Sequence, residues 1–126
     1  MRRLWFGVGL LTALLLLCLW VTKSTEDAQA AISSLLEQAS STAYAGDLSG
    51  GVALSQQAYA RWVRCRNQIA CVADHTPIEE ADCLFEELFV FGNTEELPHF
   101  ISCCRQLRQL LISIGDAHSL TYWNFI

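Results

Sequence analysis

The sequence predicts an all-α protein, in which a single N-terminal transmembrane helix is followed by an antiparallel bundle of three or four helices. An uncharged, leucine-rich run extends from Leu4 to Thr22. In the rest of the chain, apolar residues recur every three or four positions, as they do on one face of a helix. Signals for strands are weak throughout, and short connections between helical segments favour antiparallel neighbours.

The run at residues 4–22 predicts a helix that crosses a lipid bilayer. At about 1.5 Å per residue it covers close to the ~30 Å hydrocarbon core. Trp5 and Trp20 lie near its two ends, where indole rings favour the headgroup layer. The rival interpretation is a cleaved signal peptide, with Ala28-Gln29-Ala30 as a small-x-small cleavage pattern. The length of the apolar run and the charged stretch before that pattern favour an uncleaved anchor.

Charge predicts the orientation of the chain. Arg2 and Arg3 precede the apolar run, and positive charge stays on the cytoplasmic side. We therefore expect a single-pass protein of the cell membrane, with residues 1–3 cytoplasmic and residues 23–126 forming a domain outside the cytoplasm. That domain keeps 6 of the 8 basic and all 13 acidic residues, a net charge of 6 − 13 = −7. Because such a domain is repelled by phosphate backbones, we expect no binding to nucleic acid.

The first helix of the outer domain is expected to continue the membrane helix outward with little or no break. Gly46 is expected to end this helix, and Asp47 to cap the next one. The second helix is predicted from Leu48 to Ala73, although glycine at 50 and Gly51 could shift its start. Its expected apolar stripe consists of Leu54, Ala58, Trp62, Cys65, Ile69 and Val72.

A third helix is predicted from Pro77 to Phe91, closed by Gly92-Asn93. A fourth helix is expected to begin between Thr94 and Leu97, because proline at 98 is tolerated only in a first turn. The sequence "DAHSLTYWNFI" then reads as a tail. The expected stripe of the third helix is Ile78, Ala81, Phe85, Leu88 and Phe89; that of the fourth is Leu97, Phe100, Ile101, Cys104, Leu107, Leu111 and Ile114.

The stretch "DHTPIEEAD" at residues 74–82 has a structural and a functional interpretation. Thr76 and Glu79 fit a capping box around Pro77, which would sit at the first helical position. Alternatively, His75, Glu79 and Asp82 supply the nitrogen and oxygen atoms that a metal ion prefers. The capping interpretation needs no chemistry, so we predict no metal or cofactor, and these three residues stand as the candidates for a metal site.

Six cysteines do not form an obvious disulfide framework. Cys18 lies in the apolar run, which leaves an odd number, and Cys103 and Cys104 are adjacent, where a disulfide would be strained. We interpret the cysteines as small core hydrophobes. The alternatives are one disulfide between neighbouring helices, through Cys83, and a thiol- or metal-dependent function of the outer domain.

The C-terminal sequence "LTYWNFI" is a candidate interaction element. Chain ends normally fray unless they are tied down. This tail either folds back on its own bundle, docks a partner or lies at the membrane interface, where Tyr and Trp are favoured. The candidate residues are Leu120, Tyr122, Trp123, Phe125 and Ile126.

The chain contains no sequence signature of catalysis. A Gly-rich phosphate loop, a Gly-x-Ser-x-Gly elbow and a His-Glu-x-x-His motif are all missing from the sequence. We therefore expect a protein-interaction or accessory module rather than an enzyme. Its partners would be the lipid bilayer, through residues 4–22, and another membrane or envelope protein; no small-molecule substrate is evident.

The order of motifs along the chain forms a recognisable pattern: a helix with a tryptophan, a His-containing corner, an acidic and apolar helix, a glycine turn and a leucine-rich last helix. The residues that carry this pattern are Gly46-Asp47, Trp62, Asp74-His75, Ile78, Asp82, Leu88, Gly92, Leu107, Leu111, Leu120 and Asn124-Phe125-Ile126. The pattern resembles the bacterial domain of unknown function family 4363. The resemblance implies a short bacterial protein with one N-terminal membrane helix and a helical outer domain, and it implies no activity. This chain departs from that family in being rich in cysteine and poor in lysine.

Overall fold

The computed structural model describes residues 1–70 and 75–123, and the side chains of these residues as far as Asp116. Within them the chain forms helices and no strand, which confirms the all-α prediction. The four helices are α1 (Arg2–Tyr44), α2 (Leu48–Ala70), α3 (His75–Asn93) and α4 (Leu97–Trp123).

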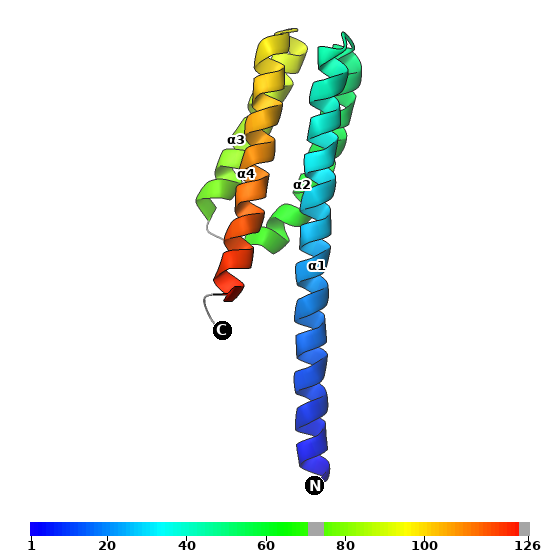
Figure 1. Cartoon of the computed structure of the whole chain (residues 1–126), viewed down its shortest axis with the longest axis vertical. Coiled ribbons are helices and arrows are strands. Elements are labelled where there is room, and N and C mark those ends of the chain that lie inside the picture. The colour runs from blue at the N-terminus through cyan, green and yellow to red at the C-terminus, as the bar shows by residue number, and fades with distance from the viewer. Residues whose placement is uncertain (71–74, 124–126) are drawn as a thin grey trace.

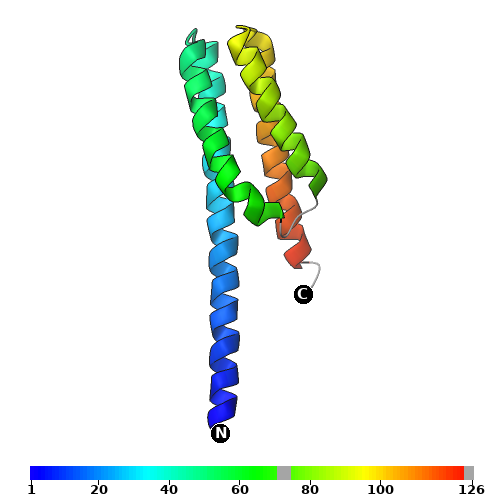
Figure 2. The same cartoon turned by 180° about the vertical axis from the view of Figure 1, so that it is seen from behind.

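The helices form two hairpins that lie side by side (Figures 1 and 2). The C-terminal half of α1 packs on α2 and on α4, while α3 packs on α4 and more lightly on α2. The N-terminal half of α1 extends alone beyond the other helices. The tight turns between α1 and α2 and between α3 and α4 lie together at the end of the molecule that is far from the N-terminus, and we call this the distal end. The other end of the packed region, where α1 leaves it, is the proximal end.

Helix α1 runs without interruption from Arg2 to Tyr44, as expected for a span that continues into the outer domain. Among the described residues it is the one helix long and apolar enough to cross a membrane, and its most apolar stretch is not buried against the rest of the chain. The hydroxyls of Thr12, Thr22 and Thr25 each donate to the carbonyl four residues earlier, at 2.8–2.9 Å. Polar groups satisfied inside the helix suit a lipid environment, which offers no water.

The turn from α1 to α2 follows the predicted chemistry. Gly46 adopts a left-handed conformation with φ of 101°, and an Asp47 carboxylate oxygen accepts a 2.9 Å hydrogen bond from the amide of Gly50. Helix α2 nevertheless starts at Leu48, so its glycines lie inside it. A Cβ on Gly51 would lie 2.8 Å from the carbonyl oxygen of Ala39. This glycine therefore allows α1 and α2 to approach closely.

The ends of α3 differ from the prediction in two ways. The helix begins at His75, so Thr76 lies inside the first turn and is not the cap that the capping box requires. At the other end, Gly92 lies inside the helix, and the left-handed residue of the following turn is Glu95, with φ of 58°. Gly92 serves packing instead, because a Cβ there would lie 2.7 Å from a methyl group of Val52.

The core contains most of the predicted stripes. In the first turns of α2 the buried position is Ser55, and the predicted Leu54 is only partly buried. Burial of the Ser55 hydroxyl is tolerated because it donates to the Val52 carbonyl at 2.7 Å. The predicted residues Cys71, Val72, Ala73 and Asp74 lie outside the described part of the chain. The largest buried side chains of the core are Trp62, Phe85, Phe100, Ile32, Leu36, Ile69, Leu88, Leu107 and Leu111.

The sequence read as a tail is largely part of α4. The helix continues to Trp123, so it carries Leu120 and Tyr122 in its last turns. The prediction that a separate tail begins at Asp116 is therefore wrong for the backbone. An uninterrupted run without proline, together with a glycine at 115 that keeps helical geometry, permits this extension. Phe125 and Ile126 lie outside the described residues.

Candidate binding groove between α1 and α4

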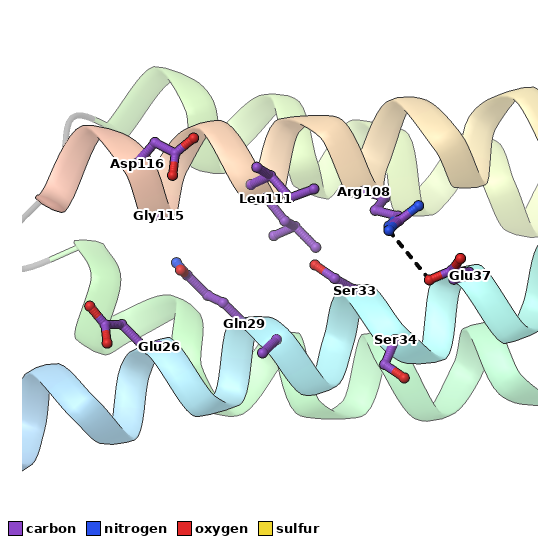
Figure 3. Close-up of a pocket in the computed structure, with 11 residues that line it drawn as sticks. Glu26, Gln29, Ser33, Ser34, Glu37, Arg108, Leu111, Gly115 and Asp116 are labelled. Atoms are coloured by element: carbon purple, nitrogen blue, oxygen red, sulfur yellow. Dashed lines mark ion pairs between the residues drawn. The ribbon is translucent and has the colours of Figure 1, made fainter. Parts of the chain in front are cut away.

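A groove of about 480 Å³ lies between α1 and α4 at the proximal end (Figure 3). Its α1 wall comes from residues spaced three and four apart, and its α4 wall comes from a facing stripe with the same spacing. The lining consists of Glu26, Gln29, Ala30, Ser33, Ser34 and Glu37 from α1, and of Arg108, Leu111, Ile112, Gly115 and Asp116 from α4.

An ion pair joins the two walls on the distal side of the groove. Arg108 Nη2 lies 3.3 Å from Glu37 Oε2, and both side chains are largely exposed to solvent, so the pair adds little to stability. The Nε atom of Arg108 is buried without a hydrogen-bond partner. The guanidinium is therefore only partly satisfied by the protein.

Gln29 is the central polar residue of the groove. Its exposed fraction is 7%, and its Nε2 atom has no hydrogen-bond partner. The amide points toward α4 at Gly115 (Figure 3), where a Cβ would lie 2.9 Å from Gln29 Oε1. A buried donor without a partner costs about 1–3 kcal/mol. Both unpaired donors are closed off from solvent, so a ligand that presents oxygen acceptors would satisfy them once the two side chains turn toward the groove.

The charges around the groove favour a cationic partner. Three carboxylates, those of Glu26, Glu37 and Asp116, line it together with a single guanidinium, that of Arg108. This excess of negative charge has the same sign as the net charge of residues 23–126. Complementary charge raises the rate of encounter and selects among partners. The groove therefore combines hydrogen-bond donors without partners and an acidic rim.

The structure places the predicted metal candidates in different surroundings. Asp82 Oδ1 accepts a 2.7 Å hydrogen bond from the indole of Trp62, and its Oδ2 lies 2.9 Å from Arg66 Nη2. Asp82 thus joins α3 to α2. His75 and Glu79 are exposed on the first turns of α3. In residues 1–70 and 75–116, no three His, Cys, Asp or Glu side chains are grouped so that they could hold a metal ion.

The cysteine thiols are free in the part of the chain that the structure describes, and Cys83 is exposed. Burial raises the pKa of Cys103 to about 11, with Glu87 adding to the effect. Burial raises the pKa of Cys104 to about 12, with Cys103 adding to it. Burial also raises the pKa of Cys65, against the opposing effect of a backbone hydrogen bond. Because the thiolate is the reactive form, these three thiols are poor nucleophiles and metal ligands.

The groove was missed by sequence reasoning, because its walls are distant in sequence. One signal could have indicated it. Gln29 occupies the apolar face of the helix, three residues before Ile32 and seven before Leu36, both of which are fully buried. A polar residue on a buried stripe needs a partner. Nothing in the sequence alone identifies α4 as the helix that it faces.

Comparison with known proteins gives no further assignment. No family model, no curated protein and no solved structure matches the chain. The resemblance to domain of unknown function family 4363 stays a prediction. Function must therefore be argued from the geometry of the helices and of the groove.

Proposed function

We propose that the chain is a single-pass membrane protein whose helical domain binds a basic segment of another protein in the groove between α1 and α4. The observation that supports this proposal is the continuity of α1. One helix carries both the unburied apolar run and one wall of the groove. Membrane attachment and binding would thus be properties of the same rigid element.

The groove has the features expected of a site for a polypeptide. Backbone carbonyls of a bound segment would accept from Gln29 and Arg108 once these side chains turn toward the groove, because their buried donors lack partners within the protein. Lysine or arginine side chains of that segment would meet the carboxylates of Glu26 and Asp116 on the rim. The partner would be another membrane or envelope protein with a cationic segment close to the bilayer surface.

The orientation that follows from Arg2 and Arg3 has the helical domain outside the cytoplasm, and Cys83 tests it. This thiol is exposed on α3. In intact cells, a membrane-impermeant maleimide should label the protein, and Cys83→Ser should remove most of that labelling. Labelling that appears only after the membrane is permeabilised would reverse the proposed topology.

Photocrosslinking tests the binding site. A photoreactive amino acid at Ala30 or Ser34, both exposed on the groove wall, should give one discrete adduct in native membranes. The same group at Gln57, exposed on α2, is the matched control and should give none. Charge reversal by Glu26→Lys should abolish the adduct. Equal adducts at all three positions, or an adduct that survives the charge reversal, would contradict the proposal.

A further inference from the structure

The proximal end of α4 lies at a height along α1 that the contacts between the two helices determine. Two contacts set the antiparallel register: the ion pair of Glu37 with Arg108, and the approach of Gln29 to Gly115. From the first contact to the second, α1 advances by eight residues toward its N-terminus and α4 by seven toward its C-terminus. The two helices therefore advance toward the proximal end by nearly equal lengths.

Extending this register places the last turn of α4 beside the end of the apolar run. Trp123 lies eight residues beyond Gly115, and eight residues before Gln29 lies Val21. Eight residues correspond to about 12 Å along a helix. Both views of the molecule show the end of α4, in red, at the same height as the blue part of α1 that extends beyond the other helices (Figures 1 and 2).

The sequence at this height matches a bilayer interface. On α1, Trp20 has an exposed fraction of 69% and directly precedes Val21. The last turns of α4 carry Tyr122 and Trp123 at the same height. Tyr and Trp are enriched where hydrocarbon meets headgroups. Two chain segments that are distant in sequence thus bring aromatic residues to one level.

We infer that the C-terminal end of α4, at residues 120–123, is a second membrane contact that lies in the interface of the bilayer. The inference rests on the proposed membrane span at residues 4–22. The nearest acidic residues along the two helices are Asp116, seven residues before Trp123, and Glu26 and Asp27, five and six residues after Val21. Their carboxylates are repelled by anionic lipid. The contact would therefore depend on aromatic and apolar insertion into a neutral lipid surface. Its consequence is that α4 holds the groove at a constant height above the membrane.

Quenching of tryptophan fluorescence by brominated lipid tests this inference on the full-length protein. The protein is reconstituted into phosphatidylcholine nanodiscs whose acyl chains carry bromine close to the headgroups. The contribution of each indole is obtained by difference from Trp20→Phe, Trp62→Phe and Trp123→Phe. The Trp123 signal should be quenched at least as strongly as that of Trp20, and the buried Trp62 should be unaffected. The quenching should be the same at low and high salt.

The outcomes separate this inference from the proposed function. Quenching of Trp20 without quenching of Trp123 would overturn the second contact and leave the span intact, as when the end of α4 folds on its own bundle or binds a protein. Absence of quenching at both positions would refute the span. Quenching of Trp123 that requires anionic lipid and disappears in salt would also overturn the inference, because it would show electrostatic attachment.

Discussion

The two ends of the packed region are built on opposite principles. At the distal end, small residues bring the helices close together: the ring of Phe100 lies within 3.4 Å of a Cβ position on Gly51 and within 3.6 Å of one on Gly92. At the proximal end, α1 and α4 leave a groove in which a buried amide lacks a partner. The distal end is closed and apolar, and the proximal end is open, polar and acidic.

This difference indicates how stability and binding are divided along one pair of helices. Close packing around Phe100 gains apolar burial and dispersion contacts, which are largest where few voids remain. At the groove the helices bury less apolar surface, and the donors of Gln29 and Arg108 are left without partners. Changes at the distal end should therefore act on folding, and changes at the proximal end should act on binding with little effect on folding.

The largest effect is expected from Phe100→Ala, which should lower the free energy of unfolding by about 3–5 kcal/mol. The ring is fully buried at the distal end, between Gly51 of α2 and Gly92 of α3, so its loss leaves a cavity in the core. Urea unfolding of the full-length protein in detergent, followed by circular dichroism, measures the change. Ile112→Ala, on the partly exposed groove wall, is the matched control and should cost much less. Equal costs would remove the distinction between the two ends.

A second large effect on the free energy of unfolding is expected from alkaline pH, because the thiols of Cys103 and Cys104 are buried on α4. Burial raises their pKa values from about 9 to about 11 and about 12. The folded state thus holds protons that the unfolded state releases. Their stabilisation is complete below pH 9 and is lost as the pH rises toward 11 and 12, by about 1.4 kcal/mol per pH unit for each thiol. Urea midpoints measured from pH 8 to pH 11 test this.

The double variant Cys103→Ala/Cys104→Ala serves as the control for the pH experiment. Its unfolding free energy should depend less steeply on pH in the same range, because the remaining titrating groups are common to both proteins. A slope equal to that of the wild type would show that the two thiols are accessible to solvent.

An intermediate effect is expected from Gly51→Ala. The added methyl group would lie 2.8 Å from the Ala39 carbonyl oxygen, a backbone atom that cannot move away easily. Overpacking of this kind costs about 1–3 kcal/mol, which outweighs the helix preference of alanine over glycine, about 1 kcal/mol at most. Gly9→Ala is the control, since a Cβ there meets nothing within 4 Å. Thermal unfolding that is unchanged by Gly51→Ala would argue against close packing at this crossing.

The smallest effect on folding is expected from Gln29→Leu. Replacing an unpaired buried amide by an apolar group of similar size should leave stability unchanged or raise it by up to about 1 kcal/mol. The same variant should lose the photocrosslinked adduct at Ser34. Ser55→Ala is the contrasting change, because that buried hydroxyl has a hydrogen-bond partner and its removal should lower stability. Destabilisation by Gln29→Leu would indicate a structural role for the amide.

Much of the fold follows from local sequence signals. The helix types, the continuity of α1, the Gly46 turn and the Asp47 cap all depend on residues close together in the chain, and the structure agrees with them. One error occurred where tertiary packing overrides such a signal, because Gly92 looked like a helix stop and is a packing site against Val52. Thr76 looked like a cap, and α3 begins one residue before it.

The candidate site was not predictable in the same way. The groove depends on the register between Gln29 and Gly115, residues far apart in the sequence, and periodicity within each helix says nothing about how two helices slide against each other. The role of Asp82 was hidden for the same reason. Its carboxylate looked available for a metal until the structure placed it against Trp62 and Arg66.

The unbroken course of α1 also has a consequence for rotation about its axis. A straight helix makes about five full turns in 18 residues, so Leu11 has nearly the same azimuth as Gln29, and Cys18 deviates from it by only about 20°. The side of the apolar run that carries these two residues therefore faces the same way as the groove. With the proposed membrane span at residues 4–22, a partner that occupies the groove and also crosses the bilayer would meet this face. Inserting one residue between the span and the groove would turn the two faces apart by about 100°.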